Sequence, residues 1–102
     1  MLFSDTIEFV VISLGEEGSI VGFNNKIYKV TVPKVNAINP VGSGDSYVAG
    51  VAIGLARNYN INDVLKLASA CGTANAMEKE TGSVRKEIVD ELIDKIRIEV
   101  LE

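Results

Sequence analysis

The residues best suited to chemistry form a short glycine-rich run, Gly42-Ser43-Gly44-Asp45, directly before an amphipathic helical pattern. Glycine backbone can approach a ligand closely, and the N-terminus of a helix directs unpaired N–H groups at it, so this run favours an anion. Asp45 would repel that anion unless its purpose is to accept a proton from a hydroxyl that attacks it. The combination indicates phosphoryl transfer, with backbone amides stabilising the charge that develops.

A simpler interpretation of the same run is a tight glycine turn followed by a Ser or Asp N-cap, which needs no ligand. The four residues alone favour this interpretation. They form neither a Walker loop, since no Lys-Ser/Thr pair follows, nor a dinucleotide fingerprint. The chain has no His and one Cys, Cys71, which excludes a hydrolytic triad with a His base, an internal disulfide and a thiolate zinc cluster. Cys71 is interpreted as a core residue.

The first half of the chain predicts about four strands. The unbroken apolar run at 9–12 is typical of a strand buried on both faces. Residues 20–23 and 27–32 flank Asn24-Asn25, a pair that suits a hairpin turn. A short strand is predicted at 35–38, before the break at Asn39-Pro40.

The second half predicts three helices. The first runs from about residue 46 to 57, the second follows Asn62 as N-cap and continues toward Gly82, and the third runs from Ser83 to Val100. The apolar stripe of the first helix is Val48, Val51, Ala52 and Leu55; that of the second is Val64, Leu67, Ala68 and Cys71; that of the third includes Ile88, Val89, Leu92, Ile93, Ile96 and Val100.

Strands followed by helices predict a single α/β domain over residues 1–102, with helices packed on a partly parallel sheet. A parallel first strand needs neighbours on both sides, and the sequence offers few candidates. We therefore expect an incomplete sheet, whose missing strands come from residues N-terminal to Met1 or from another chain.

Composition supports the same expectation. The 102 residues are 47% apolar with a mean hydropathy of +0.22, which allows for surface that another segment covers. A net charge of −4 without a basic block argues against nucleic acid as a partner. No apolar stretch reaches the length that spans a bilayer, so we expect no membrane partner and a soluble, cytoplasmic protein.

The longer string at 39–52, NPVGSGDSYVAGVA, resembles the C-terminal signature of the PfkB, or ribokinase-like, family of carbohydrate kinases. The resemblance implies the C-terminal portion of an α/β/α sandwich. It assigns the ATP anion hole to Gly42, Ser43 and Gly44 and the catalytic base to Asp45. Ser43 stands where many members have Ala, which leaves the backbone donors intact.

A second string, Ser13-Leu14-Gly15-Glu16-Glu17-Gly18, looks like the nucleotide loop of the same family, in the expected order. In isolation this pattern is more often a simple turn; together with the later signature it assigns nucleotide contact to Ser13, Gly15 and Gly18. Asn75 interrupts an apolar helical stripe and could reach an adenine edge, with Cys71, Gly72 and Ala76 as apolar walls; a capped or partner-facing Asn75 fits equally well.

Within the family, the strings Val41-Gly42-Ser43-Gly44-Asp45-Ser46 and Gly72-Thr73-Ala74-Asn75-Ala76 look most like the phosphosugar branches, the tagatose-6-phosphate kinases and 1-phosphofructokinases. This resemblance implies ATP and Mg²⁺ as cofactors and a ketohexose monophosphate, tagatose 6-phosphate or fructose 1-phosphate, as acceptor. No residue of the chain is assigned as a metal ligand. The family's sugar-binding residues lie in its N-terminal part, so we expect the 102 residues alone to be inactive.

Two other interpretations remain open. The chain could be a non-catalytic association module that forms a homo-oligomer through an exposed sheet edge. It could also belong to a PfkB-type kinase that acts on an unphosphorylated sugar or a nucleoside, a choice that residues N-terminal to this chain would decide.

Overall fold

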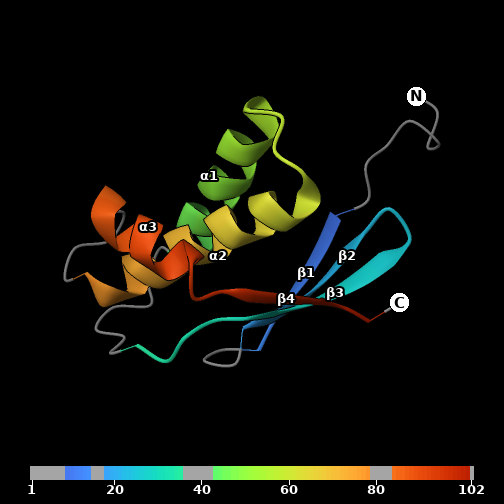
Figure 1. The fold of residues 1–102 in the computed structure, drawn as a ribbon, viewed down its shortest axis with the longest axis horizontal. Coiled ribbons are helices and arrows are strands. Elements are labelled where there is room, and N and C mark those ends of the chain that lie inside the picture. The colour runs from blue at the N-terminus through green and yellow to red at the C-terminus, as the bar shows by residue number, and fades with distance from the viewer. Residues whose placement is uncertain (1–8, 15–17, 36–42, 79–83, 102) are drawn as a thin grey trace.

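The computed structural model describes residues 9–14, 18–35, 43–78 and 84–101, which form a four-stranded antiparallel sheet with three helices on one face (Figure 1). The strands lie in the order β1-β2-β3-β4, so the C-terminal strand completes a sheet begun by the N-terminal three. The strands are β1 (Phe9–Ser13), β2 (Ser19–Phe23), β3 (Lys26–Thr31) and β4 (Arg97–Val100). The helices are α1 (Ser43–Ala56), α2 (Ile61–Met77) and α3 (Lys86–Ile93).

The β2–β3 hairpin forms as the sequence predicts. Asn24 and Asn25 have φ angles of 49° and 66°, and Phe23 pairs with Lys26 across the turn. Two successive positive φ angles match the right-handed twist of the flanking strands, and Asn adopts them more readily than most residues. The turn therefore fixes the register of β2 against β3.

Gly18 determines how the chain enters β2. Its φ is 104°, and a Cβ built on it would overlap the carbonyl oxygen of Val30. The Gly18 carbonyl also accepts a hydrogen bond from Leu14 N at 2.8 Å. A side chain at this position would both strain the backbone and separate β2 from β3.

Two glycines allow α1 and α2 to pack closely. Gly50 and Gly54 are buried on the same face of α1, where added Cβ atoms would lie 2.7 Å from Ala68 Cα and 3.0 Å from Val64 Cγ2. Because side chains are absent at these two positions, the backbone of α1 can approach α2 closely. Larger side chains normally keep the axes of packed helices 8–10 Å apart. This contact, rather than the sheet, holds most of α1 in place.

The predicted caps of the second and third helices are wrong. The N-cap of α2 is Asn60 instead of Asn62, and Asn60 Oδ1 accepts a hydrogen bond from Asp63 N at 2.9 Å. Asn60 satisfies an N–H of the first turn, which Asn62, already inside that turn, cannot do. The helix ends at Met77 rather than near Gly82, and α3 follows Arg85, which makes no side-chain capping bond. Ser83, the predicted cap of α3, lies outside the described residues.

The prediction of one helix from Ser83 to Val100 is also wrong. The chain leaves α3 after Ile93, Lys95 N donates to the Leu92 carbonyl at 2.9 Å, and β4 pairs with β3. Ile96 and Val100 fit a helical spacing, but residues 97–100 also alternate charged and apolar side chains, which suits a strand. Residues 97–100 form a strand rather than a helix because they pair with β3, which is distant in sequence.

The prediction that the first strand is buried on both faces is wrong. Val10 and Ile12 are 59% and 58% exposed, because they lie on the face of the sheet opposite the three helices. The described sheet is wholly antiparallel rather than partly parallel. The first half contributes three described strands, since Val35 is not in a strand and residues 36–38 lie outside the described ranges.

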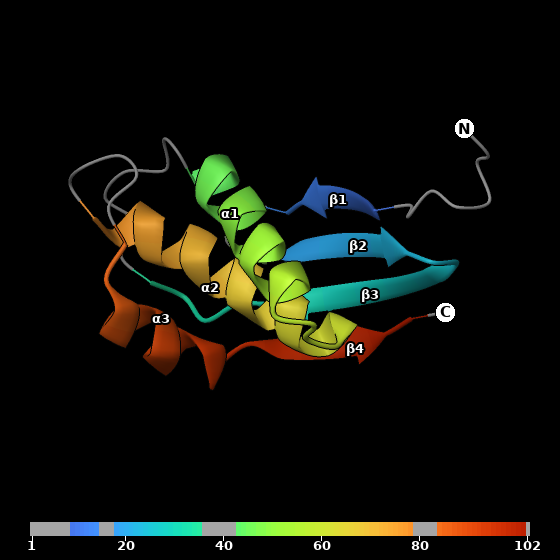
Figure 2. The same ribbon diagram turned by 90° about the horizontal axis from the view of Figure 1, so that it is seen from above.

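The core lies between the sheet and the helices α2 and α3 (Figure 2). Side chains from the helix-covered face of β2 and β3 meet the inner faces of both helices there. The buried cluster consists of Val21, Tyr28, Val30, Leu65, Ala70, Ala74, Val89, Leu92 and Ile96. Among the described residues, no helix has the length and apolar character needed to cross a bilayer.

Candidate functional site

A cavity of about 1080 Å³ separates α1 from the β1 side of the sheet. In Figure 1, α1 rises away from the strands while α2 lies along them. The cavity has walls from β1, the segment after β3, α1 and α2. Protein interiors rarely leave voids larger than a water molecule, so a space of this size marks a place for something else to bind.

The two glycine-containing segments predicted to bind nucleotide meet at this cavity. Ser13 and Gly18 line it from the sheet, and Gly44 lines it from the first turn of α1. Gly15 and Gly42 lie outside the described residues, and Ser43 is the first residue of α1. The structure therefore brings together segments about 26 residues apart, as the phosphoryl-transfer interpretation requires.

The N-terminus of α1 has space for a ligand. A Cβ built on Gly44 would meet no atom of the described residues within 4 Å. The first N–H groups of a helix have no partner within it, so those of α1 are available to an anion in that space.

Asp45 is the acidic residue in the first turn of α1, and its side chain is exposed. A carboxylate at this position is compatible with the positive end of the helix dipole. Asp45 is one residue from Gly44 but is not among the residues that line the cavity. Its role as base stays a prediction.

Asn75 occupies a different environment from the predicted adenine contact. Its side chain is fully buried in α2 and lines neither described cavity. The part of α2 that does line the large cavity consists of Ser69, Gly72, Thr73 and Ala76. These residues recur at three- and four-residue steps, so a helical stripe of small side chains is the sequence signal that could have identified all four.

Of the predicted apolar walls, Gly72 and Ala76 line the cavity and Cys71 does not. Cys71 is half-buried, and burial raises the pKa of its thiol. A raised pKa keeps the thiol protonated and unreactive, in agreement with its interpretation as a core residue.

Tyr47 brings a polar group that the sequence analysis did not identify. It lines the cavity from α1, and its hydroxyl oxygen is buried without a hydrogen-bond partner among the described residues. Desolvation raises the pKa of this hydroxyl to about 12. A buried hydroxyl without a partner is costly, so this one favours a state in which something fills the cavity.

The rest of the α1 wall is apolar. Val48, Val51 and Leu55 line the cavity, so most of the stripe predicted for this helix faces empty space rather than a packed core. Phe9 and Val11 face them from β1, and Phe9 makes an edge-to-face contact with Phe23 at 5.9 Å between ring centroids. One end of the cavity is thus suited to an anion and the other to apolar groups.

The described residues form no evident magnesium cage. No three Asp, Glu, Cys or His side chains within 9–14, 18–35, 43–78 and 84–101 converge on one point. Magnesium in phosphoryl-transfer sites is held largely by the phosphates and water, with one or two carboxylates. A magnesium ion here would depend on nucleotide and on residues outside those ranges.

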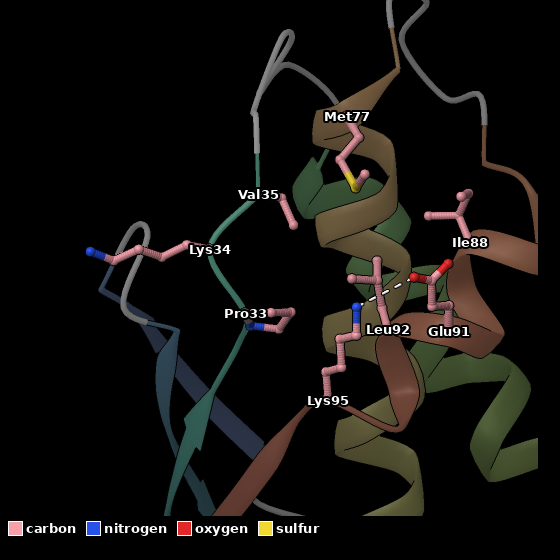
Figure 3. A pocket seen from close by; sticks show the side chains of 8 residues that line it. All are labelled: Pro33, Lys34, Val35, Met77, Ile88, Glu91, Leu92 and Lys95. Carbon is pink, nitrogen blue, oxygen red and sulfur yellow. Dashed lines mark hydrogen bonds and ion pairs between the residues drawn. The ribbon is translucent and has the colours of Figure 1, made fainter.

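A second cavity of about 110 Å³ lies between the segment after β3 and the helices α2 and α3 (Figure 3). Its apolar lining includes Met77, Ile88 and Leu92. At its edge Lys95 Nζ forms an ion pair with Glu91 Oε1 at 3.3 Å. Pro33, Lys34 and Val35 line both cavities and form the wall between them.

Solved structures define the class of fold. A candidate phosphofructokinase from Staphylococcus aureus superposes with a TM-score of 0.85 at 33% identity, covering 92% of this chain and 30% of that one. Phosphofructokinase-2 from Escherichia coli superposes with a TM-score of 0.76 at 26% identity, covering 84% and 28%. Ribokinase from Thermotoga maritima, at 19% identity and a TM-score of 0.75, shares the fold over 85% of this chain and 30% of its own. The chain has the C-terminal part of a ribokinase-like α/β fold.

Sequence comparison gives the family. Residues 2–87 match the model of the pfkB family carbohydrate kinases, and the chain belongs to that family. It is 44% identical over 97 residues to tagatose-6-phosphate kinase from Staphylococcus epidermidis, a match that covers 95% of this chain and 31% of the relative. The chain thus spans about a third of the length of the curated relatives it matches.

Proposed function

We propose that this chain provides the nucleotide-binding part of an ATP-dependent phosphosugar kinase. The observation that carries the proposal is the convergence of Ser13, Gly18 and Gly44 on one cavity at the N-terminus of α1. The similarity to tagatose-6-phosphate kinase and to phosphofructokinases supports a ketohexose monophosphate, tagatose 6-phosphate or fructose 1-phosphate, as acceptor and a bisphosphate as product.

In the proposed reaction, the backbone N–H groups at the start of α1 bind the phosphates of ATP. Gly42, Ser43 and Gly44 hold the charge that develops on the transferred phosphoryl group, and Gly15 and Gly18 hold the nucleotide loop close to it. Asp45 accepts the proton of the attacking sugar hydroxyl. ATP would supply the phosphoryl group, and Mg²⁺, when bound, would offset the negative charge of the phosphates.

The nucleoside would occupy the part of the cavity lined by α2 and the segment after β3. Ser69 and Thr73 offer hydroxyls there, and Gly72 and Ala76 leave room for a flat ring. Asn75, predicted as the adenine contact, would serve from behind this wall by holding α2 in place, since its side chain is fully buried.

A chimeric enzyme tests the proposal. The matched segment of the Staphylococcus epidermidis kinase is replaced by this chain, and turnover of tagatose 6-phosphate with ATP and Mg²⁺ is measured. Asp45→Asn should reduce kcat by roughly 10³-fold or more, because the proton acceptor is lost, and leave nucleotide affinity nearly unchanged.

Asp63→Asn is the matched control. Asp63 is also an exposed acidic residue in the first turn of a helix, but it belongs to α2 and lines neither cavity. Its substitution should leave kcat within about twofold. Equal turnover of the Asp45→Asn chimera and its parent would remove Asp45 from the mechanism.

The same assay applied to the 102 residues alone should give little or no turnover. By family resemblance the groups that position the sugar lie outside this chain, and positioning accounts for a large part of the barrier reduction in such reactions. Robust turnover by the isolated chain would contradict this expectation.

A further inference from the structure

We infer that Lys34 is a nucleotide-binding residue of this chain, and that its ammonium group binds a phosphate of the nucleotide beside Gly18. This inference rests on the proposed function, because it takes the large cavity to be the nucleotide site. It adds to that function a charged side chain, since the glycine-containing segments contact a ligand with backbone groups alone.

Lys34 has the only charged side chain among the described residues that line the large cavity. The other described residues of that lining are glycines, apolar residues and residues with a hydroxyl group. No described carboxylate lines the cavity, so its own wall does not neutralise the ammonium group. A largely apolar cavity with one cation in its wall favours a ligand that has a negative charge.

The ammonium group of Lys34 is available to a ligand. The three ion pairs found within the described ranges do not include Lys34, and its side chain is exposed. Lys34 belongs to the wall between the two cavities, and Figure 3 shows its side chain pointing away from Met77 and Ile88 in the small one. The charge therefore lies on the side of the wall that faces the large cavity.

The register of the sheet places Lys34 near the glycine that enters β2. A Cβ built on Gly18 would meet the backbone of Val30 and Thr31 at the end of β3. Lys34 follows Thr31 by three residues, which span at most about 10 Å when fully extended. The segment after β3 thus continues from the contact with Gly18 into the wall of the cavity, which Gly18 and Lys34 both line.

A nucleotide needs a positive charge at this site. The chain has a net charge of −4, and Asp45 lies one residue from Gly44, so both disfavour the approach of phosphates. The N-terminus of α1 offers only about half an elementary charge. A lysine ammonium group supplies a full charge and three donors, and lysine is a common phosphate ligand. Lys34 therefore offsets repulsion that the backbone amides alone leave in place.

The phosphate of the sugar acceptor offers the same chemistry, but the position of Lys34 favours the nucleotide. Lys34 belongs to the segment after β3, which together with α2 borders the space proposed for the nucleoside. The phosphates of ATP are bonded to that nucleoside, whereas the phosphate of the acceptor belongs to a separate molecule. We therefore expect Lys34 to determine the affinity for ATP and not the affinity for the sugar phosphate.

The kinase chimera tests this expectation with two substitutions. Lys34→Gln should raise the KM for ATP by roughly tenfold, because a charge-assisted contact is lost, and should change kcat and the KM for tagatose 6-phosphate by less than about twofold. Lys34→Arg keeps the charge and should stay within about threefold of the parent. An unchanged KM for ATP in Lys34→Gln, or an equal rise in the KM for tagatose 6-phosphate, would overturn the inference.

Lys26→Gln is the matched control. Lys26 is also exposed, belongs to β3 and lines neither cavity, so its substitution removes the same charge from a neighbouring part of the chain. It should change the KM for ATP by less than about twofold. Equal effects of Lys26→Gln and Lys34→Gln would show that only the net charge matters, which contradicts a direct contact with phosphate.

Direct binding separates this inference from the proposed kinase activity. Without acceptor, Lys34→Gln should weaken the affinity of the chimera for ATP by roughly tenfold and for adenosine by less than about twofold, because adenosine has no phosphate. Equal weakening of both would indicate a structural role and overturn the inference. A chimera that binds ATP through Lys34 without turnover would refute only the proposed function. An active chimera whose ATP affinity is independent of Lys34 would refute only the inference, and a chimera that neither binds nor reacts would refute both.

Discussion

The two sides of this sheet differ in how completely helices pack against them. On the β3–β4 side, α2 and α3 bury Tyr28, Val30 and Leu92 in a continuous core. On the β1 side, α1 is held mainly through its glycines against α2, and its apolar side chains face a cavity. Both sides are rich in apolar residues, so composition does not distinguish them. The difference teaches that one side supplies most of the packed core, whereas the other leaves apolar side chains beside a cavity.

A pair of identical truncations, one on each side, should show the largest difference. Leu65 is fully buried in α2, and Leu65→Ala should lower the free energy of unfolding by about 3 kcal/mol, through lost burial and the cavity left behind. Leu55 on α1 is 46% exposed, and Leu55→Ala should cost no more than about 1 kcal/mol. Urea denaturation of the isolated chain measures both, and equal losses would show that the β1 side is packed after all.

A second pair compares two glycines of the same helix. Gly50→Ala places a Cβ 2.7 Å from Ala68 Cα and should destabilise the chain by about 2 kcal/mol, because backbone atoms of α2 must move. Gly44→Ala meets no atom within 4 Å and should be neutral or stabilising by up to about 1 kcal/mol, the helix propensity gained. Thermal unfolding followed by circular dichroism ranks the two. A larger loss for Gly44→Ala would contradict the described contact between the helices.

The smallest effect expected at neutral pH concerns Tyr47. An unfolded tyrosine ionises near pH 10, whereas burial raises the pKa of Tyr47 to about 12. Between these values the unfolded state holds fewer protons than the folded one, so the free energy of unfolding falls as pH rises. Tyr47→Phe should remove this part of the pH dependence and, at neutral pH, leave stability unchanged or raised by about 1 kcal/mol or less.

Tyr59→Phe is the control for Tyr47. Tyr59 is exposed, and its hydroxyl accepts a weak hydrogen bond from Arg57 Nη1 at 3.4 Å. Its loss should change the free energy of unfolding by less than about 0.5 kcal/mol. Denaturation of both variants from pH 7 to pH 12 makes the comparison, and an unchanged pH dependence in Tyr47→Phe would show that its hydroxyl is solvated.

The sequence predicted those features that depend on local chemistry. Asn24-Asn25 suits only a few turns, and the glycine run before α1 marks a helix N-terminus open to a ligand. The Asn pair predicted the hairpin, and the glycine run predicted where α1 begins. Ser13, Gly18 and Gly44 line one cavity and Asn75 lies in the interior, and the binding roles assigned to all four stay predictions.

What the sequence could not show depends on contacts between distant residues. Ile96 and Val100 satisfy a helical spacing as well as a strand, and only pairing with β3 selects the strand. Gly50 and Gly54 have no apolar side chain that a periodicity analysis could detect, yet they determine which face of α1 contacts α2. Because the glycines occupy the face of α1 that contacts α2, Val48 and Leu55 face the cavity. Tyr47 also lines this cavity, where its hydroxyl is buried.

The position of β4 has a consequence for the order in which the chain can fold during synthesis. Thr31 pairs with Arg97 and Tyr28 with Val100, so the core beside β3 joins residues more than 60 positions apart in sequence. The contact between α1 and α2 joins Gly50 to Ala68 and can form much sooner. A ribosome would therefore release the hairpin and the helical pair before the strand that locks them together. Until β4 arrives, the edge of β3 that β4 covers is open to wrong partners.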